Sequence, residues 1–149
     1  MVYAERGEVR SGELHERWNA VRRQQGKFQK QLALELVTNA CVEIPPDGCG
    51  IREIDKFQRH LAPDGIAIVV YEFDSVGSGE KPLYDGSQIV DSAYGSGKPR
   101  QTLRILYYNN SQHYQPILNM RGAVGSRGFY IPCNRSYTHE AQHKCSNKC

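Results

Sequence analysis

Apolar residues recur at helical spacing in two stretches of the first half of the chain. The first stripe consists of Phe28, Leu32, Leu36 and Ala40, and the second of Ile51, Ile54, Phe57 and Leu61. Positions three or four apart lie on one face of an α-helix, so each stripe predicts an amphipathic helix. The first helical pattern begins at about Glu16 and strengthens after Phe28. Prolines and glycines within residues 44–50 and 62–65 end the two helices.

Runs of β-branched and aromatic residues predict three strands after the helices. They span residues 66–73, 103–108 and 113–120. Four residues, 109–112, separate the last two runs, which is the length of a hairpin loop. Pro116 has no backbone N–H to donate, so its run is predicted to be an edge strand. Residues 74–100 are rich in Gly, Ser, Pro and Asp, which predicts a long connection with little regular structure.

The order of these elements predicts an α+β fold, in which two helices pack on a small, mostly antiparallel sheet. A chain of 149 residues is long enough to bury a core of its own. We expect a disordered N-terminal segment at residues 1–15, an α+β module at residues 16–120, and a basic Cys/His tail at residues 121–149 that forms a short zinc-finger-like appendage.

Positive charge is concentrated near the C-terminus. Residues 1–120 contain 14 basic and 15 acidic residues, whereas residues 121–149 contain five basic residues and one acidic residue. The five are Arg121, Arg127, Arg135, Lys144 and Lys148. A basic tail is suited to polyanions such as DNA. Five charges without an ordered face are more typical of a solvated surface, and DNA binding is the alternative interpretation.

The cysteine count and the N-terminus bear on the cellular compartment. Five cysteines cannot all pair within one chain. No apolar segment follows Met1 as it would in a signal peptide, and no apolar run approaches the ~20 residues that span a bilayer. We therefore expect no membrane insertion and a reducing, intracellular compartment, with the nucleus as a candidate. In such a compartment, clustered Cys and His indicate metal ligands before disulfides.

The segment "YIPCNRSYTHEAQHKCSNKC", residues 130–149, gathers nitrogen and sulfur donors on a stretch with few apolar residues. The spacing Cys133-x9-His143-x-Cys145-x3-Cys149 predicts a Cys3His zinc site, with His139 as the alternative fourth donor. A bound metal would supply folding energy that apolar burial cannot supply there. A strong zinc-finger motif begins with a Cys-x2-Cys pair, but the position three residues before Cys133 is Tyr130. The alternative interpretation is a disordered basic tail with free thiols.

His113 and Cys49 are the candidate catalytic residues. His113 begins a predicted strand, and an imidazole with a pKa near neutrality is suited to act as a general base. Cys49 precedes the second helix, whose N-terminal dipole is expected to lower the pKa of the thiol. Cys41 follows the first helix, where the dipole disfavours a thiolate. The structural alternatives are a histidine bonded to backbone at the end of a turn and a cysteine that fills a turn.

The order of the segments resembles a region of large proteins from Polinton/Maverick-like mobile elements, upstream of a protein-primed, type-B DNA polymerase. The matching segments are "FQKQLALELVTNACV", "GCGIREIDKFQRHL", "LRILYYNNSQHYQPI" and "CNRSYTHEAQHKC", and the resemblance covers Trp18 to Cys149. The stretch ending in His-Tyr also resembles the second half of an OTU-type papain-like cysteine protease.

The resemblance implies that His113 takes the place of the catalytic histidine and that a zinc module follows the His-Tyr strand. The corresponding nucleophile would lie upstream of the first helix, and no cysteine precedes Cys41. The chain also has no polymerase carboxylate motif. Our leading expectation is therefore a non-catalytic, zinc-binding piece of a polymerase-associated protein, with a structural role or one close to nucleic acid. The alternatives are an OTU-like protease or deubiquitinase-like unit and a degenerate gene product.

Overall fold

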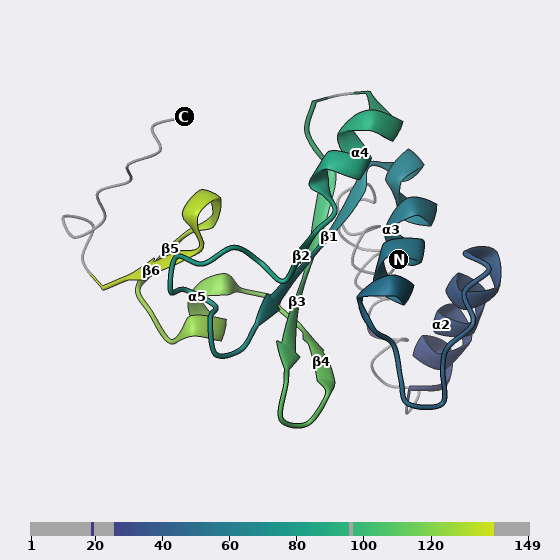
Figure 1. Ribbon diagram of the computed structural model, residues 1–149, viewed down its shortest axis with the longest axis horizontal. Helices are drawn as coiled ribbons and strands as arrows, with labels where there is room; N and C mark the ends of the chain where they lie inside the picture. The colour runs from purple at the N-terminus through teal and green to yellow at the C-terminus, as the bar shows by residue number, and fades with distance from the viewer. Residues whose placement is uncertain (1–18, 20–25, 96, 139–149) are drawn as a thin grey trace. The chain divides into compact units, whose positions relative to one another are not determined.

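The computed structural model describes Asn19 and residues 26–95 and 97–138 (Figure 1). The elements of these residues are α2 (Lys27–Asn39), α3 (Ile51–Leu61), the 3₁₀ helix η2 (Ala62–Asp64), β1 (Ile66–Glu72), β2 (Tyr84–Asp85), α4 (Ser87–Tyr94), β3 (Gln101–Tyr108), β4 (His113–Pro116), α5 (Met120–Val124), β5 (Gly128–Tyr130), the 3₁₀ helix η3 (Ile131–Cys133) and β6 (Arg135–Tyr137). The N-terminal segment predicted to be disordered, residues 1–15, lies outside the described residues.

Two compact units make up the chain. The first comprises Met1–Ala67 and Gly86–Thr102, and the second comprises Ile68–Asp85 and Leu103–Cys149. The first unit therefore contains α2, α3 and α4, and the second contains most of the sheet together with α5 and the β5–β6 hairpin. Among the described residues, no helix is both long and apolar enough to cross a bilayer.

The larger sheet has the strand order β2-β1-β3-β4, which Figure 1 shows as neighbouring arrows. The pairs β1–β2 and β3–β4 are antiparallel. Strands β1 and β3 run parallel, because Gln101 N–H donates to Gly65 O near their starts and Phe73 N–H donates to Tyr107 O near their ends. The sheet is thus mixed, and the predicted α+β class is confirmed. Residues 97–138 show no zinc-finger appendage, and the rest of the predicted appendage, residues 139–149, lies outside the described part of the chain.

The predicted hairpin is present. In β3 and β4, Tyr108 pairs with His113 and Ile105 pairs with Pro116, so the loop is residues 109–112. β4 is an edge strand, as the missing N–H of Pro116 predicts. The strand ends at Pro116, however, and Met120 belongs to α5. Asn119 caps this helix by accepting a hydrogen bond from Arg121 N–H on Oδ1 at 3.0 Å, so the prediction of a strand up to Met120 is wrong.

The expectation of little regular structure in residues 74–100 is also wrong, because this stretch contains β2 and α4. Helix α4 has few apolar positions, so its sequence shows no long stripe. It forms because Val90 is fully buried against Ala62 and Ala67 of the same unit, with Ile89 beside them. These partners are distant in the sequence, and burial of Val90 contributes about 1.5–3 kcal/mol.

Helix α3 begins and ends where the apolar pattern predicts. Ile54 and Leu61 are buried, whereas Ile51 is 36% exposed. The same helix buries a polar residue that the stripe did not include. Gln58 has no exposed surface, and its Nε2 donates to Ile66 O at 2.9 Å. This bond ties α3 to the start of β1, and a buried amide without such a partner would be costly.

Helix α2 is less buried than its stripe suggests. None of its residues is fully buried, and Phe28, Leu32 and Leu36 are half-buried. Leu34, outside the stripe, is 58% exposed. The periodicity therefore identified the more protected face of α2 correctly, although that face does not enter a core.

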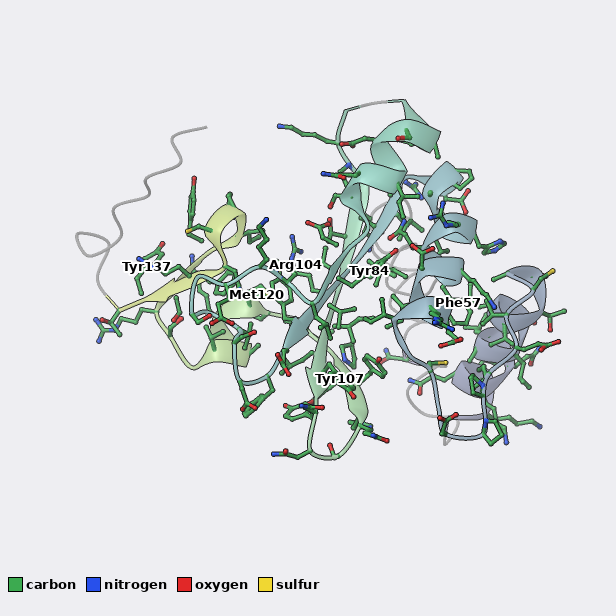
Figure 2. All side chains as sticks on the ribbon, in the orientation of Figure 1. Phe57, Tyr84, Arg104, Tyr107, Met120 and Tyr137 are labelled. Carbon is green, nitrogen blue, oxygen red and sulfur yellow. The ribbon has the colours of Figure 1, made fainter. Side chains whose placement is uncertain are left out.

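The second unit has its own apolar core on one face of the sheet. Val69, Tyr71 and Leu106 are buried there, and Val76, Tyr108, Ile117 and Met120 pack against them. Met120 is labelled beside α5 in Figure 2. Alternate residues of a strand point to the same face, which explains why β1 and β3 each supply every second residue to this core.

Gly86 provides a test of the packing around Gln58. Its φ of −86° suits any residue, but a Cβ at this position would overlap the side chain of Gln58, which is fully buried. We expect Gly86→Ala to lower the free energy of unfolding by about 2 kcal/mol, because Gln58 must move and weaken its bond to Ile66. Chemical denaturation measures this change.

Gly122→Ala in α5 is the matched control. A Cβ there would meet its nearest neighbour, Asn119 Cβ, at 4.0 Å, so there is room for it. The free energy of unfolding should stay the same or rise by up to about 1 kcal/mol, since alanine favours a helix over glycine. Equal stability of the two variants would contradict the role assigned to Gln58.

Candidate metal centre

The predicted ligand Cys133 lies in the turn of the β5–β6 hairpin. Gly128 pairs with Tyr137 and Tyr130 pairs with Arg135. Between the strands, residues 131–133 form η3, and Pro132 suits its first turn because no N–H is needed there. Asn134 closes η3 by donating its backbone N–H to Ile131 O at 3.1 Å. Cys133 is half-buried, and its Sγ lies 4.0 Å from Tyr130 O.

The hairpin depends on a glycine at its open end. A Cβ at Gly128 would overlap the ring of Tyr137, its partner on the opposite strand. The ring therefore covers the space that a side chain would fill. This cross-strand packing holds the open ends of β5 and β6 together. The turn that contains Cys133 connects the two strands at their other ends.

Asn134 attaches this turn to a distant loop, Ser75–Glu80. The residue is only 3% exposed, and its φ of 46° lies in the left-handed region, which asparagine tolerates better than most residues. Its Oδ1 accepts a hydrogen bond from Gly77 N–H at 3.1 Å. Its Nδ2 donates to Glu80 O at 2.8 Å and, at a longer 3.4 Å, to Ser75 O. The side-chain amide thus bonds on both its oxygen and its nitrogen.

Backbone bonds reinforce the attachment. Gly79 N–H donates to Asn134 O at 2.8 Å, and Ser136 N–H donates to Gly77 O at 3.0 Å. Gly77 and Gly79 have φ values of 85° and 97°, a conformation that side chains rarely adopt. The loop therefore follows the hairpin closely because it has glycine at both positions. We call Ser75–Glu80 the glycine loop.

The other predicted ligands, His143, Cys145 and Cys149, lie outside the described residues, as does the alternative donor His139. Within residues 26–95 and 97–138, no group of three or more His, Cys, Asp or Glu side chains could hold a metal ion. The zinc site therefore stays a prediction, with Cys133 as its one described member.

His113 lies where the pattern placed it, at the first residue of β4. Its side chain is exposed on the edge strand, opposite Tyr108. Gln112 just before it has a φ of 49°, so the loop turns sharply into the strand. A general base in this position is open to solvent.

The environment of Cys49 differs from the expected one. Burial raises the pKa of its thiol, and the nearby charge of Glu53 raises this pKa further. This direction is opposite to the lowering expected from the helix N-terminus, which is occupied by the Glu53 carboxylate. This carboxylate accepts a hydrogen bond from Gly50 N–H at 2.8 Å. A raised pKa keeps the thiol protonated and makes Cys49 a weaker nucleophile.

The two candidate catalytic residues belong to different units. Cys49 is in the first unit and His113 is in the second, so neither unit by itself contains the predicted pair. Cys41 follows α2 in the first unit, where it is exposed and has a φ of 52°. The catalytic interpretation of Cys49 and His113 stays a prediction.

The second unit contains a pocket that no local sequence pattern indicates. It has a volume of about 380 Å³ and is lined by Leu106, Tyr108, Gln115, Ile117, Asn119 and Ala123, among others. Tyr108 Oη donates to Gln115 Oε1 at 3.1 Å on its wall. The residues that line it are uncharged. Because they come from β3, β4, α5 and the residues between β4 and α5, no single segment of the sequence reveals the pocket.

Arg104 and Tyr71 form a polar contact beside the core of the second unit. Burial raises the pKa of the Tyr71 hydroxyl, and the charge and hydrogen bond of Arg104 oppose this rise. Arg104 Nε is buried without a hydrogen-bond partner among the described residues. Since this nitrogen is closed to solvent, an external anion has no access to it.

Comparisons with protein-family models, with curated proteins and with solved structures found no match to this chain. The resemblance to mobile-element proteins therefore stays a prediction.

Glu53 makes the start of α3 sensitive to pH. The hydrogen bond from Gly50 N–H lowers the pKa of its carboxyl group, with smaller contributions from Lys56 and Arg52. The Glu53 carboxylate stabilises α3 fully above the ordinary glutamate pKa of about 4.3. This stabilisation is lost as the pH falls through the lowered pKa of Glu53. We expect the Gly50 amide to exchange faster, relative to its intrinsic rate, below that pH. Glu53→Gln should remove this pH dependence, whereas Glu35→Gln in α2 should not.

Proposed function

We propose that this protein is a non-catalytic zinc-binding module, in which Cys133, His143, Cys145 and Cys149 hold one Zn²⁺. His139 is the alternative to Cys149. The observation that supports the proposal most directly is the fixed position of Cys133. It ends a 3₁₀ turn closed by Asn134, a residue that is 3% exposed and bonded to a distant loop.

A fixed turn favours metal binding for a thermodynamic reason. A ligand that is already held in place loses little conformational freedom when the metal binds. Cys133 is half-buried, so part of its surface is open to other donors. The remaining donors follow within 16 residues on a polar stretch that has little apolar area to bury. Coordination by thiolate and imidazole supplies folding energy to such a segment.

One observation weighs against an OTU-like or papain-like alternative that uses Cys49. The pKa of the Cys49 thiol is raised, which disfavours the thiolate that would attack a substrate. The non-catalytic role is therefore the better supported of the two.

The proposal extends to nucleic acid and to a larger protein. Arg121, Arg127 and Arg135 are exposed on the second unit, which also contains the predicted zinc site. Exposed guanidinium groups bind phosphates through charge and paired hydrogen bonds. Together with the resemblance to mobile-element proteins, this supports a module that lies close to DNA within a polymerase-associated protein.

Metal analysis tests the zinc site directly. We expect wild-type protein purified without chelators to contain about one equivalent of zinc, and Co²⁺ exchange to give the spectrum of a tetrahedral thiolate site. Cys133→Ser should weaken zinc binding by at least about tenfold, because an alcohol replaces a thiolate ligand. Cys41→Ser is the matched control, since Cys41 is in the first unit and outside the predicted set. Less than about half an equivalent in the wild type would refute the site.

Fluorescence anisotropy with single-stranded DNA tests the nucleic-acid role. Replacing Arg121 and Arg127 with alanine should weaken binding and reduce the slope of log K against log salt concentration by up to about 1.4, since each phosphate contact on a single strand contributes roughly 0.7. Replacing Arg52 and Arg59 of α3 serves as the control with equal loss of charge. The same loss of affinity in both double variants would indicate attraction by net charge alone.

A further inference from the structure

We propose that the pocket formed by β3, β4, α5 and the residues between β4 and α5 binds one unpaired nucleobase of single-stranded DNA. All of its lining residues belong to the second unit, and its volume is about 380 Å³. The inference rests on the nucleic-acid role proposed above and deepens it, because it names the part of a nucleotide that this unit recognises. It does not involve the predicted zinc ligands.

The size and the lining of the pocket limit what can enter it. Its volume of about 380 Å³ lies near the lower end of the range for small-ligand sites, about 300–1,000 Å³. Leu106, Ile117 and Ala123 supply apolar surface. No charged residue lines the pocket, so an ionic group that entered it would lose hydration without gaining a counter-charge. The pocket therefore favours a small, neutral group.

Tyr108 gives the pocket an aromatic wall that is already part of a stack. Its ring packs on the ring of Phe73, with the two centroids 4.7 Å apart and the ring planes inclined by 26°. Phe73 is 48% exposed, so the stacked pair reaches the surface. Aromatic side chains bind single strands because every base has a flat face that can stack on them. A planar heterocycle is therefore favoured over a branched aliphatic group.

The side-chain amides of the pocket present N–H donors. Asn119 Oδ1 accepts from Arg121 N–H at 3.0 Å, and Gln115 Oε1 accepts from Tyr108 Oη at 3.1 Å. Their nitrogens, Asn119 Nδ2 and Gln115 Nε2, have no hydrogen-bond partner in the described part of the chain. Carbonyl oxygens and ring nitrogens on the edge of a base can accept from these groups. An apolar side chain of a peptide would cover the donors without accepting, which is unfavourable.

The charge around the pocket suits a polyanion. Residues 103–138, which supply every lining residue, contain four arginines and no Asp or Glu: Arg104, Arg121, Arg127 and Arg135. The carboxylates in the described part of the second unit belong to residues 68–85, and none of them lines the pocket. A neutral pocket in a basic segment matches a nucleotide, which joins a neutral base to an anionic phosphate. Bases of a duplex are paired and stacked, so an unpaired base fits the site.

Strands with and without bases test the proposal. In fluorescence anisotropy, we expect the full chain to bind a short oligothymidylate about tenfold more tightly than an abasic strand of equal length, because a stacked base contributes affinity of this order. The two strands carry the same phosphates, so log K should fall with log salt concentration at the same slope. Equal affinity for both strands would overturn the base pocket and leave the proposed DNA-binding role intact. Failure to bind either strand would overturn both.

A larger side chain at Gly122 blocks the pocket. A Cβ at this lining residue would meet Asn119 Cβ at 4.0 Å, so α5 can accept a side chain there. Gly122→Leu should abolish the preference for oligothymidylate, whereas Gly122→Ala, which adds a single carbon, should retain it. Both variants should bind the abasic strand as the wild type does, which shows that they are folded. A full preference in Gly122→Leu would overturn the assignment of the base to this pocket.

Gln115→Met tests the hydrogen bonds to the base. Gln115 is exposed on the edge strand, and methionine keeps the length of the side chain while it removes the N–H donors. Affinity for oligothymidylate should fall by about fivefold, with no change for the abasic strand. Gln31→Met in α2 is the matched control, since Gln31 is also exposed but belongs to the first unit. Unchanged affinity in Gln115→Met, or an equal loss in both variants, would overturn this recognition of the base.

Discussion

In the second unit, the attachment of the β5–β6 hairpin to residues 75–80 depends on one buried amide, that of Asn134. Asn134 is 3% exposed, and its five hydrogen bonds join the β5–β6 hairpin to residues 75–80 and close the turn beside Cys133. A buried amide is tolerated only when its donors and acceptors are satisfied, so these bonds specify one arrangement of hairpin and loop. Glycines at positions 77 and 79 let the loop backbone come close enough to bond. The first unit uses the same device, since buried Gln58 donates to Ile66 O and lies against Gly86.

The N-terminus of α3 illustrates how local competition decides the chemistry of a site. Its positive end can favour either a thiolate or a carboxylate. Glu53, three residues into the helix, reaches back to Gly50 N–H, and its pKa is lowered as a result. Cys49 lies outside this cap, and burial and the neighbouring carboxylate raise the pKa of its thiol. The same helix end therefore stabilises a structural carboxylate and leaves the cysteine a poor nucleophile, which favours a structural over a catalytic interpretation.

Different interactions stabilise different parts of the chain. Apolar burial holds the helices of the first unit and the sheet of the second, with Val90, Val70 and Tyr71 among the most deeply buried side chains. The hairpin around Cys133 is held by hydrogen bonds and by the Tyr137 ring over Gly128. Beyond it, the chain offers thiol and imidazole groups and little apolar area. The proposed metal ion would supply the stabilisation that apolar burial does not supply there.

The sequence by itself determined the elements whose signals are local. The limits of α3, the strand at Ile66–Glu72, the four-residue hairpin loop and the edge position of the Pro116 strand follow from periodicity, from turn length and from the missing N–H of proline. For the candidate site, the set of possible ligands was readable, but neither the hairpin turn that contains Cys133 nor the attachment of that turn to residues 75–80 was. Only the tertiary structure decided that β1 and β3 run parallel, that α4 forms around Val90, and that Gln58 and Asn134 are buried. The physical reason is distance along the chain: an apolar stripe is visible within a few turns, whereas a buried amide is explained only by partners such as Ile66 or Gly77, which folding brings to it.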